Sequence, residues 1–159
     1  MNCRGRCCTF EANSVQITPL ETLEIYRSLE ESNRWNEELK KRLEQTIKDY
    51  RLDYDIPTTR GLSLRKTYTC PFFNHGPKGC SLDREIKPYG CLGFNPLKEG
   101  NLNGENCGQN NALLEKREQK HNLLETELNQ QIANALGLEW KKLPIPMALL
   151  DFDRKYRES

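Results

Sequence analysis

The chain has 159 residues and a formal net charge of +1, with basic and acidic residues interleaved along it. This balance argues against a nucleic-acid partner, because a phosphate backbone selects a surface of one positive sign. No apolar run approaches the roughly 20 residues of a membrane helix, and the first residues lack the apolar core of a secretory signal, so we expect a cytoplasmic protein without a membrane partner.

The length favours one domain, because single cores commonly hold about 100 to 200 residues. We expect residues 1–159 to form this domain, with a cysteine-cluster metal-binding region over 3–110 that includes helices at about 19–50. A C-terminal helix and a docking tail should follow over 111–159. Hydrophobic residues make up only 36% of the chain, so an additional stabilising interaction besides the hydrophobic core would help to hold the fold.

The first helix is predicted to begin at Pro19, a residue that suits the first helical position. Thr18 is the expected N-cap, and Glu21 three residues later completes a capping box. The polar residues 31–33 should interrupt this helix. A second helix should then present an apolar stripe formed by Trp35, Leu39, Leu43, Ile47 and Tyr50.

The helical pattern disappears over residues 52–110, where five prolines and four cysteines occur. Loops longer than about 12 to 15 residues are usually functional or disordered, so a bound metal would explain order in this stretch. A strong helical pattern resumes over 112–136, and Gly137 is its expected stop. Its apolar side is predicted to hold Leu114, His121, Leu124, Leu128, Ile132 and Ala135. The tail at 143–153 is apolar enough to dock on the helices.

Seven cysteines are the most unusual feature of the composition. A disulfide framework is the weaker explanation, because cytosolic thiols stay reduced and an odd count leaves one unpaired. Thiolates are preferred ligands of zinc and of iron–sulfur clusters, and both need about four protein ligands. The candidate metal ligands are Cys3, Cys7, Cys8, Cys70, Cys80, Cys91 and Cys107.

Other sites are poorly supported by the sequence. Cys7 and Cys8 would project to opposite sides of an extended segment, so we expect one to ligate while its neighbour serves a second ion, tunes the first or stays free. His75 is interpreted as a turn residue and His121 as a core or boundary residue of the late helix. A radical-SAM motif would need a third cysteine where Phe10 stands.

The segments CRGRCCTF (3–10), SVQITPLE (14–21) and CPFFNHGPKGCSLDREIKPYGCLGF (70–94) together resemble the YkgJ-type cysteine-cluster family, the CxxCxxCC zinc- or iron-chelating domain. The matching positions are Ile17, Thr18, Glu21, Cys70-Pro71-Phe72, Gly79-Cys80, Lys87-Pro88, Cys91 and Phe94. The resemblance covers about residues 3–95. It departs from the family pattern in having three N-terminal cysteines rather than four, for which Cys107 is a candidate substitute, and in having Lys87 in place of an arginine.

The resemblance implies a metal-binding or iron–sulfur protein, and some relatives are linked to flagellin lysine methylation. Proline directly after a ligating cysteine, as at Cys70-Pro71, occurs in ferredoxin-type cluster loops. Five aromatic residues could either exclude water from such a cluster or simply fill the core: Phe10, Phe72, Phe73, Tyr89 and Phe94. We therefore favour an iron–sulfur cluster, 4Fe–4S in type, over zinc.

The expected fold is mainly α, a small helical domain around an irregular, cysteine-rich, metal-stapled central region. The expected function is to hold an iron–sulfur cluster or zinc for structural, redox or metal-handling use. One alternative is a cluster- or thiol-dependent enzyme, related to methyltransferases, with a spare thiol such as Cys8 as its reactive group. Another is a helical protein that binds an unidentified protein partner and uses zinc only for its shape.

Overall fold

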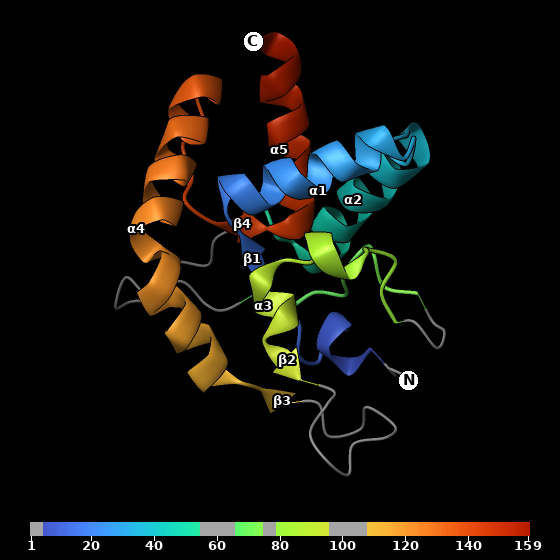
Figure 1. Ribbon diagram of the computed structural model, residues 1–159. Helices are drawn as coiled ribbons and strands as arrows, with labels where there is room; N and C mark the ends of the chain where they lie inside the picture. Colours follow the sequence, from blue (N-terminus) through green and yellow to red (C-terminus); the bar gives the residue numbers. More distant parts are fainter. Residues whose placement is uncertain (1–4, 55–65, 75–78, 96–107) are drawn as a thin grey trace.

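The computed structural model describes residues 5–54, 66–74, 79–95 and 108–159 (Figure 1). Its α-helices are α1 (Pro19–Glu31), α2 (Glu37–Tyr50), α3 (Tyr89–Leu92), α4 (Asn111–Leu136) and α5 (Ile145–Glu158). Its short strands are β1 (Gln16–Ile17), β2 (Phe94–Asn95), β3 (Gly108–Gln109) and β4 (Leu143–Pro144). Two 3₁₀ turns, η1 (Arg6–Cys8) and η2 (Arg84–Ile86), complete the regular structure of the described part. The prediction of a mainly α fold is confirmed.

Helix α5 packs against both α1 and α2, and α1 also packs against α4, which stands along one side of the molecule (Figure 1). Strand β1 pairs antiparallel with β4, so the segment before α1 lies beside the start of α5. Strand β2 pairs antiparallel with β3. The turn η1 and the short helix α3 lie at the end of the molecule opposite the C-terminus of α5 (Figure 1).

Helix α1 begins at Pro19, as predicted, and the capping box is complete. The Glu21 main-chain N–H donates to Thr18 Oγ1 over 3.3 Å, and the Thr18 N–H donates to Glu21 Oε2 over 2.9 Å. The helix ends at Glu31, and Asn33 in the following turn has a φ of 54°. The predicted interruption at 31–33 is therefore confirmed.

The apolar tail forms a helix of the core, which the sequence analysis had assigned only as a docking segment. Residues Ile145, Ala148, Leu149 and Phe152 of α5 are buried. Their i, i+3, i+4, i+7 spacing gives one apolar stripe, which fits between α1 and α2. Pro146 does not prevent the helix, because a proline in the first turn removes no intrahelical hydrogen bond.

The prediction for the apolar side of the late helix is only partly correct. Helix α4 runs to Leu136 and Gly137 ends it with a φ of 62°, as expected. None of its residues is buried, however, and His121 and Leu124 are exposed, so His121 is not a core residue. Ala135 is also exposed. The physical reason is the position of α4 at the side of the fold, where only part of it meets other helices (Figure 1).

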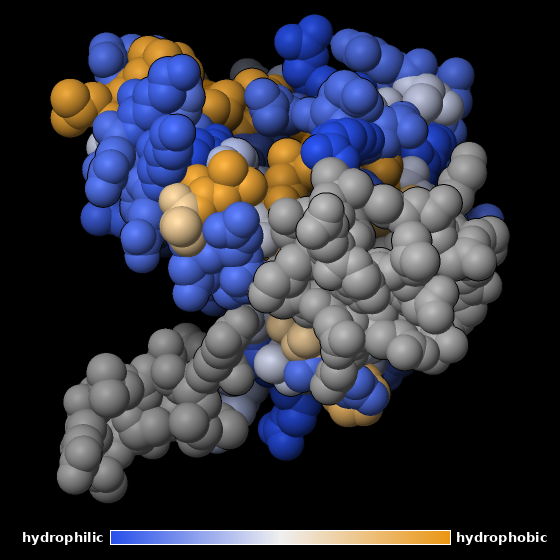
Figure 2. Space-filling view, turned by 60° about the horizontal axis from the view of Figure 1, so that its bottom comes forward, coloured by the Kyte–Doolittle hydropathy of each residue, from blue (hydrophilic) through white to orange (hydrophobic). Residues whose placement is uncertain are grey.

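Three leucines of α4 are exposed to a large degree: Leu113 by 44%, Leu123 by 89% and Leu124 by 59%. Figure 2 shows one face of the molecule, on which hydrophobic residues form several areas among hydrophilic ones.

Within the described residues, no helix combines the length and the apolar character that a bilayer crossing requires.

The stretch between α2 and α4 is irregular over the residues that the structure describes there. Its regular elements in those residues are η2, α3, β2 and β3, all of two to four residues. Residues 55–65, 75–78 and 96–107 lie outside the described part, and they include His75 and Cys107. The expected irregular centre is confirmed for the described part, whereas its stapling by a metal stays a prediction.

Candidate metal centre

The N-terminal cysteine turn is hydrogen-bonded to the segment that carries Cys70. The Cys70 N–H donates to the carbonyl oxygen of Cys8 over 2.7 Å. Further along, the Tyr68 N–H donates to the Asn13 carbonyl over 3.0 Å, and Asn13 Nδ2 donates to the Tyr68 carbonyl over 2.9 Å. These contacts place two distant parts of the chain side by side.

Cys70 and Cys80 lie on two segments, 70–74 and 79–81, that pair with each other; we call these two segments the cysteine hairpin and each of them a leg. Phe73 forms an antiparallel bridge with Cys80, and the Ser81 N–H donates to the carbonyl of Phe72 over 2.8 Å. The Phe73 N–H also donates to the Cys70 carbonyl over 2.9 Å. This backbone pairing brings the two cysteines together, although nine residues separate them in the sequence.

Cys91 comes from α3, which is fixed to the start of α1. The Tyr89 N–H donates to Glu21 Oε1 over 2.8 Å, while the other oxygen of the same carboxylate caps α1. Glu21 therefore has two structural roles, and the second could not be read from the capping-box pattern. It holds the third cysteine-bearing segment against the helices.

Cys70 is buried, whereas Cys7, Cys80 and Cys91 are half-buried. Burial raises the pKa of Cys70 well above its usual value, and negative charge on Cys91, Cys80 and Cys7 raises it further. Burial also raises the pKa of Cys91 to about 12, again with contributions from Cys80 and Cys7. Because charge on one thiol affects another only at short range, these couplings make Cys7, Cys70, Cys80 and Cys91 the candidate ligand set, which we call the four-thiol group.

The remaining predicted ligands are Cys8, which adjoins Cys7, and two cysteines outside the described residues. Cys8 Sγ lies 4.0 Å from Cys7 Sγ. Cys3 and Cys107 belong to residues that the structure does not describe. Cys8, Cys70, Cys80 and Cys91 form no disulfide bond. Among the described residues, no three His, Cys, Asp or Glu side chains are arranged as a group that could hold a metal ion.

The donor set nevertheless has the chemistry of a zinc or iron–sulfur site. Thiolate sulfur is the preferred ligand of both, and four such ligands complete the usual shell. Burial opposes an isolated thiolate, whereas a bound cation favours it, so a metal would compensate the desolvation that raises the pKa of Cys70 and Cys91. Thiol chemistry therefore suits the group that the sequence predicted, but the described side chains are not arranged as a metal-binding group, so the metal stays a prediction.

The aromatic residues predicted to shield the site differ in burial. Phe72 is buried, Phe73, Tyr89 and Phe94 are half-buried, and Phe10 is 56% exposed. Phe72 also belongs to the main hydrophobic core. Core packing thus explains the burial of Phe72. Phe10 is too exposed to exclude water from the thiols.

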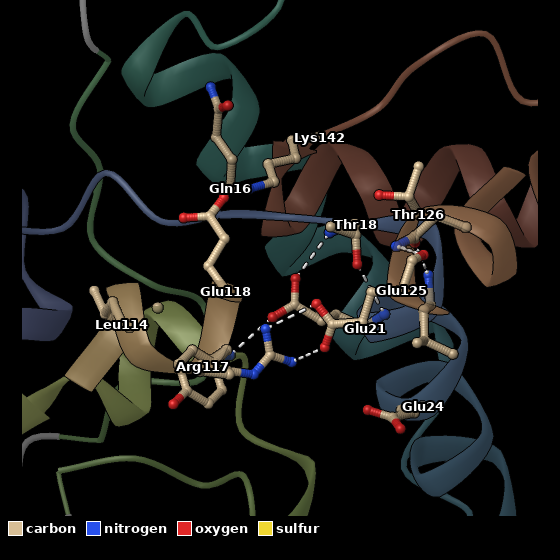
Figure 3. A pocket seen from close by; sticks show the side chains of 14 residues that line it. Gln16, Thr18, Glu21, Glu24, Leu114, Arg117, Glu118, Glu125, Thr126 and Lys142 are labelled. Carbon is tan, nitrogen blue, oxygen red and sulfur yellow. Dashed lines mark hydrogen bonds and ion pairs between the residues drawn. The ribbon is translucent and has the colours of Figure 1, made fainter. Parts of the chain in front are cut away.

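A polar pocket of about 370 Å³ lies beside the cysteine group, between the start of α1, α3 and α4 (Figure 3). The Arg117 guanidinium lies 3.7 Å from the centroid of the Tyr89 ring and pairs with Glu125. Glu24 also lines the pocket. Its pKa is raised by burial and then by the negative charge of Glu21, while Arg117 opposes the rise.

Sequence reasoning did not identify this pocket, because its walls come from segments far apart in the chain. The pairing of Arg117 with Glu125 spans eight residues, so it has no i, i+3 or i, i+4 signature. Tyr89 and Gly90 of the pocket wall directly precede Cys91. The pocket and the four-thiol group therefore share α3 as a common wall.

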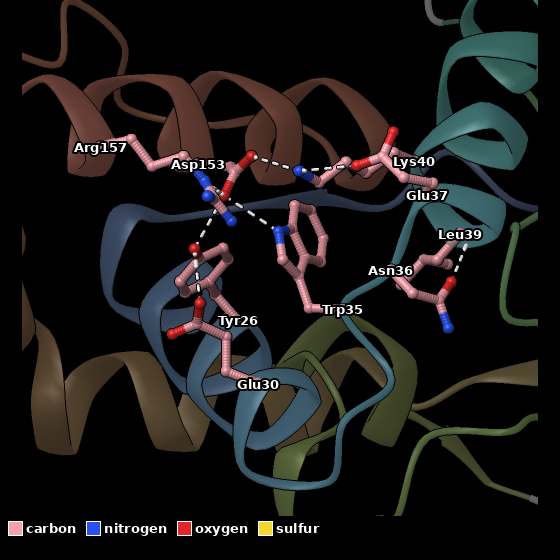
Figure 4. Close-up of polar contacts among 9 residues, drawn as sticks. All are labelled: Tyr26, Glu30, Trp35, Asn36, Glu37, Leu39, Lys40, Asp153 and Arg157. Carbon is pink, nitrogen blue, oxygen red and sulfur yellow. Dashed lines mark hydrogen bonds and ion pairs between the residues drawn. The ribbon is translucent and has the colours of Figure 1, made fainter.

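A buried carboxylate ties together the three helices on which the cysteine segments rest (Figure 4). Asp153 of α5 accepts hydrogen bonds from the Tyr26 hydroxyl over 2.8 Å and from Trp35 Nε1 over 2.9 Å. It also pairs with Lys40 over 3.2 Å and with Arg157 over 2.7 Å. Burial raises the pKa of Asp153, but hydrogen bonds from these four groups outweigh it, so the net pKa lies below the usual value.

Comparisons with protein-family models, with curated proteins and with solved structures found no match to this chain. The resemblance to the YkgJ-type family therefore stays a prediction from the sequence.

Proposed function

We propose that this chain is a metal-binding cysteine-cluster protein that holds an iron–sulfur cluster, or zinc, through the thiolates of Cys7, Cys70, Cys80 and Cys91. The observation that carries the proposal is that η1 is hydrogen-bonded to the Cys70 leg of the cysteine hairpin and that this leg pairs with the Cys80 leg. Negative charge on Cys7 and Cys80 contributes to the raised pKa of both Cys70 and Cys91, which agrees with that arrangement. Cys3, Cys8 and Cys107 belong to the wider set of candidate ligands.

The family resemblance supports the same conclusion. Its cysteine positions Cys70, Cys80 and Cys91 are three of the four proposed ligands. When bound, a cluster would supply one-electron transfer, and zinc would supply folding free energy. The chain's own residues cover Cys70, which is only 7% exposed.

The alternatives from the sequence have less support. A catalytic thiol needs a lowered pKa, so the upward pKa shifts of Cys70 and Cys91 argue against these two as the reactive group of an enzyme, and Cys8 stays the candidate for that role. The exposed leucines of α4 are compatible with a protein partner, but they do not indicate which one. A cluster-dependent enzyme would have a place for a substrate in the pocket beside α3.

The test is to purify the protein without oxygen and to measure iron, sulfide, zinc and the visible absorption spectrum. Brown protein with iron and sulfide would identify a cluster, and colourless protein with stoichiometric zinc would identify the alternative. Cys70→Ser and Cys91→Ser should each lower the bound metal strongly. Cys8→Ser is the matched control, because Cys8 adjoins Cys7 in the chain but is not among the four proposed ligands.

The proposal fails if the wild-type protein holds neither metal after anaerobic purification and reconstitution. It also fails if Cys70→Ser keeps the full metal content. Loss of metal in Cys8→Ser to the same extent as in Cys70→Ser would replace Cys7 by Cys8 in the ligand set, since only one of the two adjacent thiols is expected to ligate.

A further inference from the structure

An arginine between α1 and α2 reaches the end of the cysteine hairpin. Arg34 Nη1 donates to the carbonyl oxygen of Ser81 over 3.0 Å. Ser81 directly follows Cys80, and its own N–H pairs with Phe72 across the hairpin. Arg34 is half-buried, so this contact lies partly out of solvent. The second leg of the hairpin is therefore attached to the helices by a guanidinium group.

A second arginine reaches the other leg. Arg42 of α2 lies with Nη1 3.4 Å from the carbonyl oxygen of Pro71, which directly follows Cys70. This is a long contact, and Arg42 also lies 3.9 Å from Glu38 on its own helix. The two arginines thus make the same type of contact, each to the residue after a cysteine, and both come from the α1–α2 region.

The described part of the hairpin has little regular structure of its own to orient its thiols. Its internal pairing consists of the bridge between Phe73 and Cys80 and the neighbouring main-chain hydrogen bonds. Such short pairing fixes the two legs relative to each other but not relative to the helices. Orientation toward Cys7 and Cys91 therefore depends on contacts between the hairpin and the helical body.

We propose that Arg34 and Arg42 are positioning residues of the cysteine centre. Each guanidinium group anchors one cysteine-bearing leg to the α1–α2 region and so keeps Cys70 and Cys80 in place for shared binding of a metal. The inference rests on the proposed function, and it adds a role for two side chains that the capping, charge and cysteine patterns of the sequence do not indicate. Removal of groups that orient metal ligands typically lowers metal affinity about 10- to 100-fold.

The experiment uses the full-length protein and Zn²⁺ as the probe. Arg34→Met and Arg42→Met keep an unbranched stem but remove the donors, and the double variant removes both anchors. Zinc affinity is measured by competition with a chromophoric chelator, and unfolding is measured for the metal-free and zinc-loaded forms. We expect about a 10-fold or greater loss of affinity in Arg34→Met, a smaller loss in Arg42→Met because its contact is longer, and the largest loss in the double variant.

Arg27→Met is the matched control. Arg27 lies on α1 and pairs with Glu31 of the same helix, and its side chain is 67% exposed, so its replacement should leave zinc affinity unchanged. Arg34→Lys should recover part of the affinity, because a lysine keeps a cationic donor but lacks the planar guanidinium group.

The possible results separate the two proposals. If wild-type protein binds zinc and the arginine variants lose affinity while their metal-free stability stays close to wild type, the inference is supported. If the metal-free and zinc-loaded forms of a variant lose the same free energy of unfolding, its zinc affinity is unchanged. The arginines then have only a structural role, and the inference is wrong. If wild-type protein fails to bind zinc at all, the proposed function is wrong and the inference falls with it.

Discussion

The main-chain N–H of Cys70 lies 2.7 Å from the carbonyl oxygen of Cys8 and donates a hydrogen bond to it. This contact joins the N-terminal turn to the first leg of the cysteine hairpin. The position of the N-terminal thiols therefore depends on the central segment. Loss of order in either segment should lower the order of the other.

Metal removal should therefore loosen both segments together. Structural zinc contributes about 10 to 16 kcal/mol of apparent binding free energy, which is comparable to the whole stability of a domain. We expect chelator treatment to increase hydrogen exchange at the Cys70 N–H and proteolysis within residues 5–17 and 66–95. The N–H groups inside α1 and α5 should stay better protected, because their core is apolar. Unchanged exchange at Cys70 would contradict a metal-ordered centre.

Gly5→Ala should disturb the N-terminal turn much more than the same change at Gly137. Both glycines have positive φ, 66° and 62°, so both replacements carry a backbone cost of about 1 kcal/mol. A Cβ at Gly5 would lie 2.0 Å from Phe73 Cε2, whereas a Cβ at Gly137 would meet nothing within 4 Å. We expect Gly5→Ala to lower metal content and Gly137→Ala to leave it unchanged.

A second-site change tests the steric explanation for Gly5. Replacing Phe73 by leucine in the Gly5→Ala protein shortens the side chain that the new Cβ would meet, and it should restore part of the metal content. If the double variant is no better than Gly5→Ala, the collision with Phe73 is not the cause.

Asp153→Asn should lower the free energy of unfolding by about 3 kcal/mol, because it removes the charge from a buried group that pairs with two cations. Asp153 is only 7% exposed, and it joins α1, α2 and α5. Denaturant unfolding measures the change. Glu31→Gln is the control, since the Glu31 side chain is 69% exposed and its pair with Arg27 should contribute less than about 1 kcal/mol.

The contribution of Asp153 should depend on pH in one direction. The net pKa of Asp153 in the folded protein lies below its unfolded value, so its stabilisation is present above the unfolded pKa of about 3.9 and is lost as the pH falls through the folded pKa. The stability difference between wild type and Asp153→Asn should be constant from pH 6 to pH 5 and should shrink below about pH 4.

A second carboxylate shares a hydrogen-bond partner with Asp153. Glu30 accepts a hydrogen bond from the Tyr26 hydroxyl over 3.0 Å, and the same hydroxyl donates to Asp153. Repeating the comparison in a Glu30→Gln background separates the two carboxylates. A difference that does not shrink on acidification would show that the charge of Asp153 is not its stabilising feature.

The contribution of Glu24 to stability should depend on pH in the direction opposite to that of Asp153, and Glu24→Gln tests this. The pKa of Glu24 in the folded protein is raised by burial and by Glu21, so the folded state favours its protonated form and stability is lost as the pH rises through the folded pKa. The glutamine variant should be slightly more stable than wild type at pH 7, by less than about 1 kcal/mol because the side chain is partly solvated, and equal to it at pH 3. If Glu24→Gln is less stable than wild type at pH 7, the idea that the negative charge of Glu24 is unfavourable in the pocket is wrong.

Local features of this protein were predictable from the sequence alone. The start of α1 at Pro19 and the stop of α4 at Gly137 depend on a few adjacent residues, because caps satisfy main-chain groups within one turn. The irregular centre was also predictable, since its prolines and glycines interrupt any helical pattern. The choice of cysteines as candidate ligands required only their chemistry and number.

Long-range arrangement was decided by the tertiary structure. The sequence gives α4 an apolar side, yet His121 and Leu124 are exposed because no other described element covers that part of the helix. The contact between the N-terminal turn and the segments that carry Cys70 and Cys80 depends on which main-chain segments pair. The contacts of Arg34 and Arg42 likewise depend on where the hairpin meets the helices. A local pattern specifies a helix because its hydrogen bonds join residues four apart, whereas a site built from distant segments exists only after the core has packed.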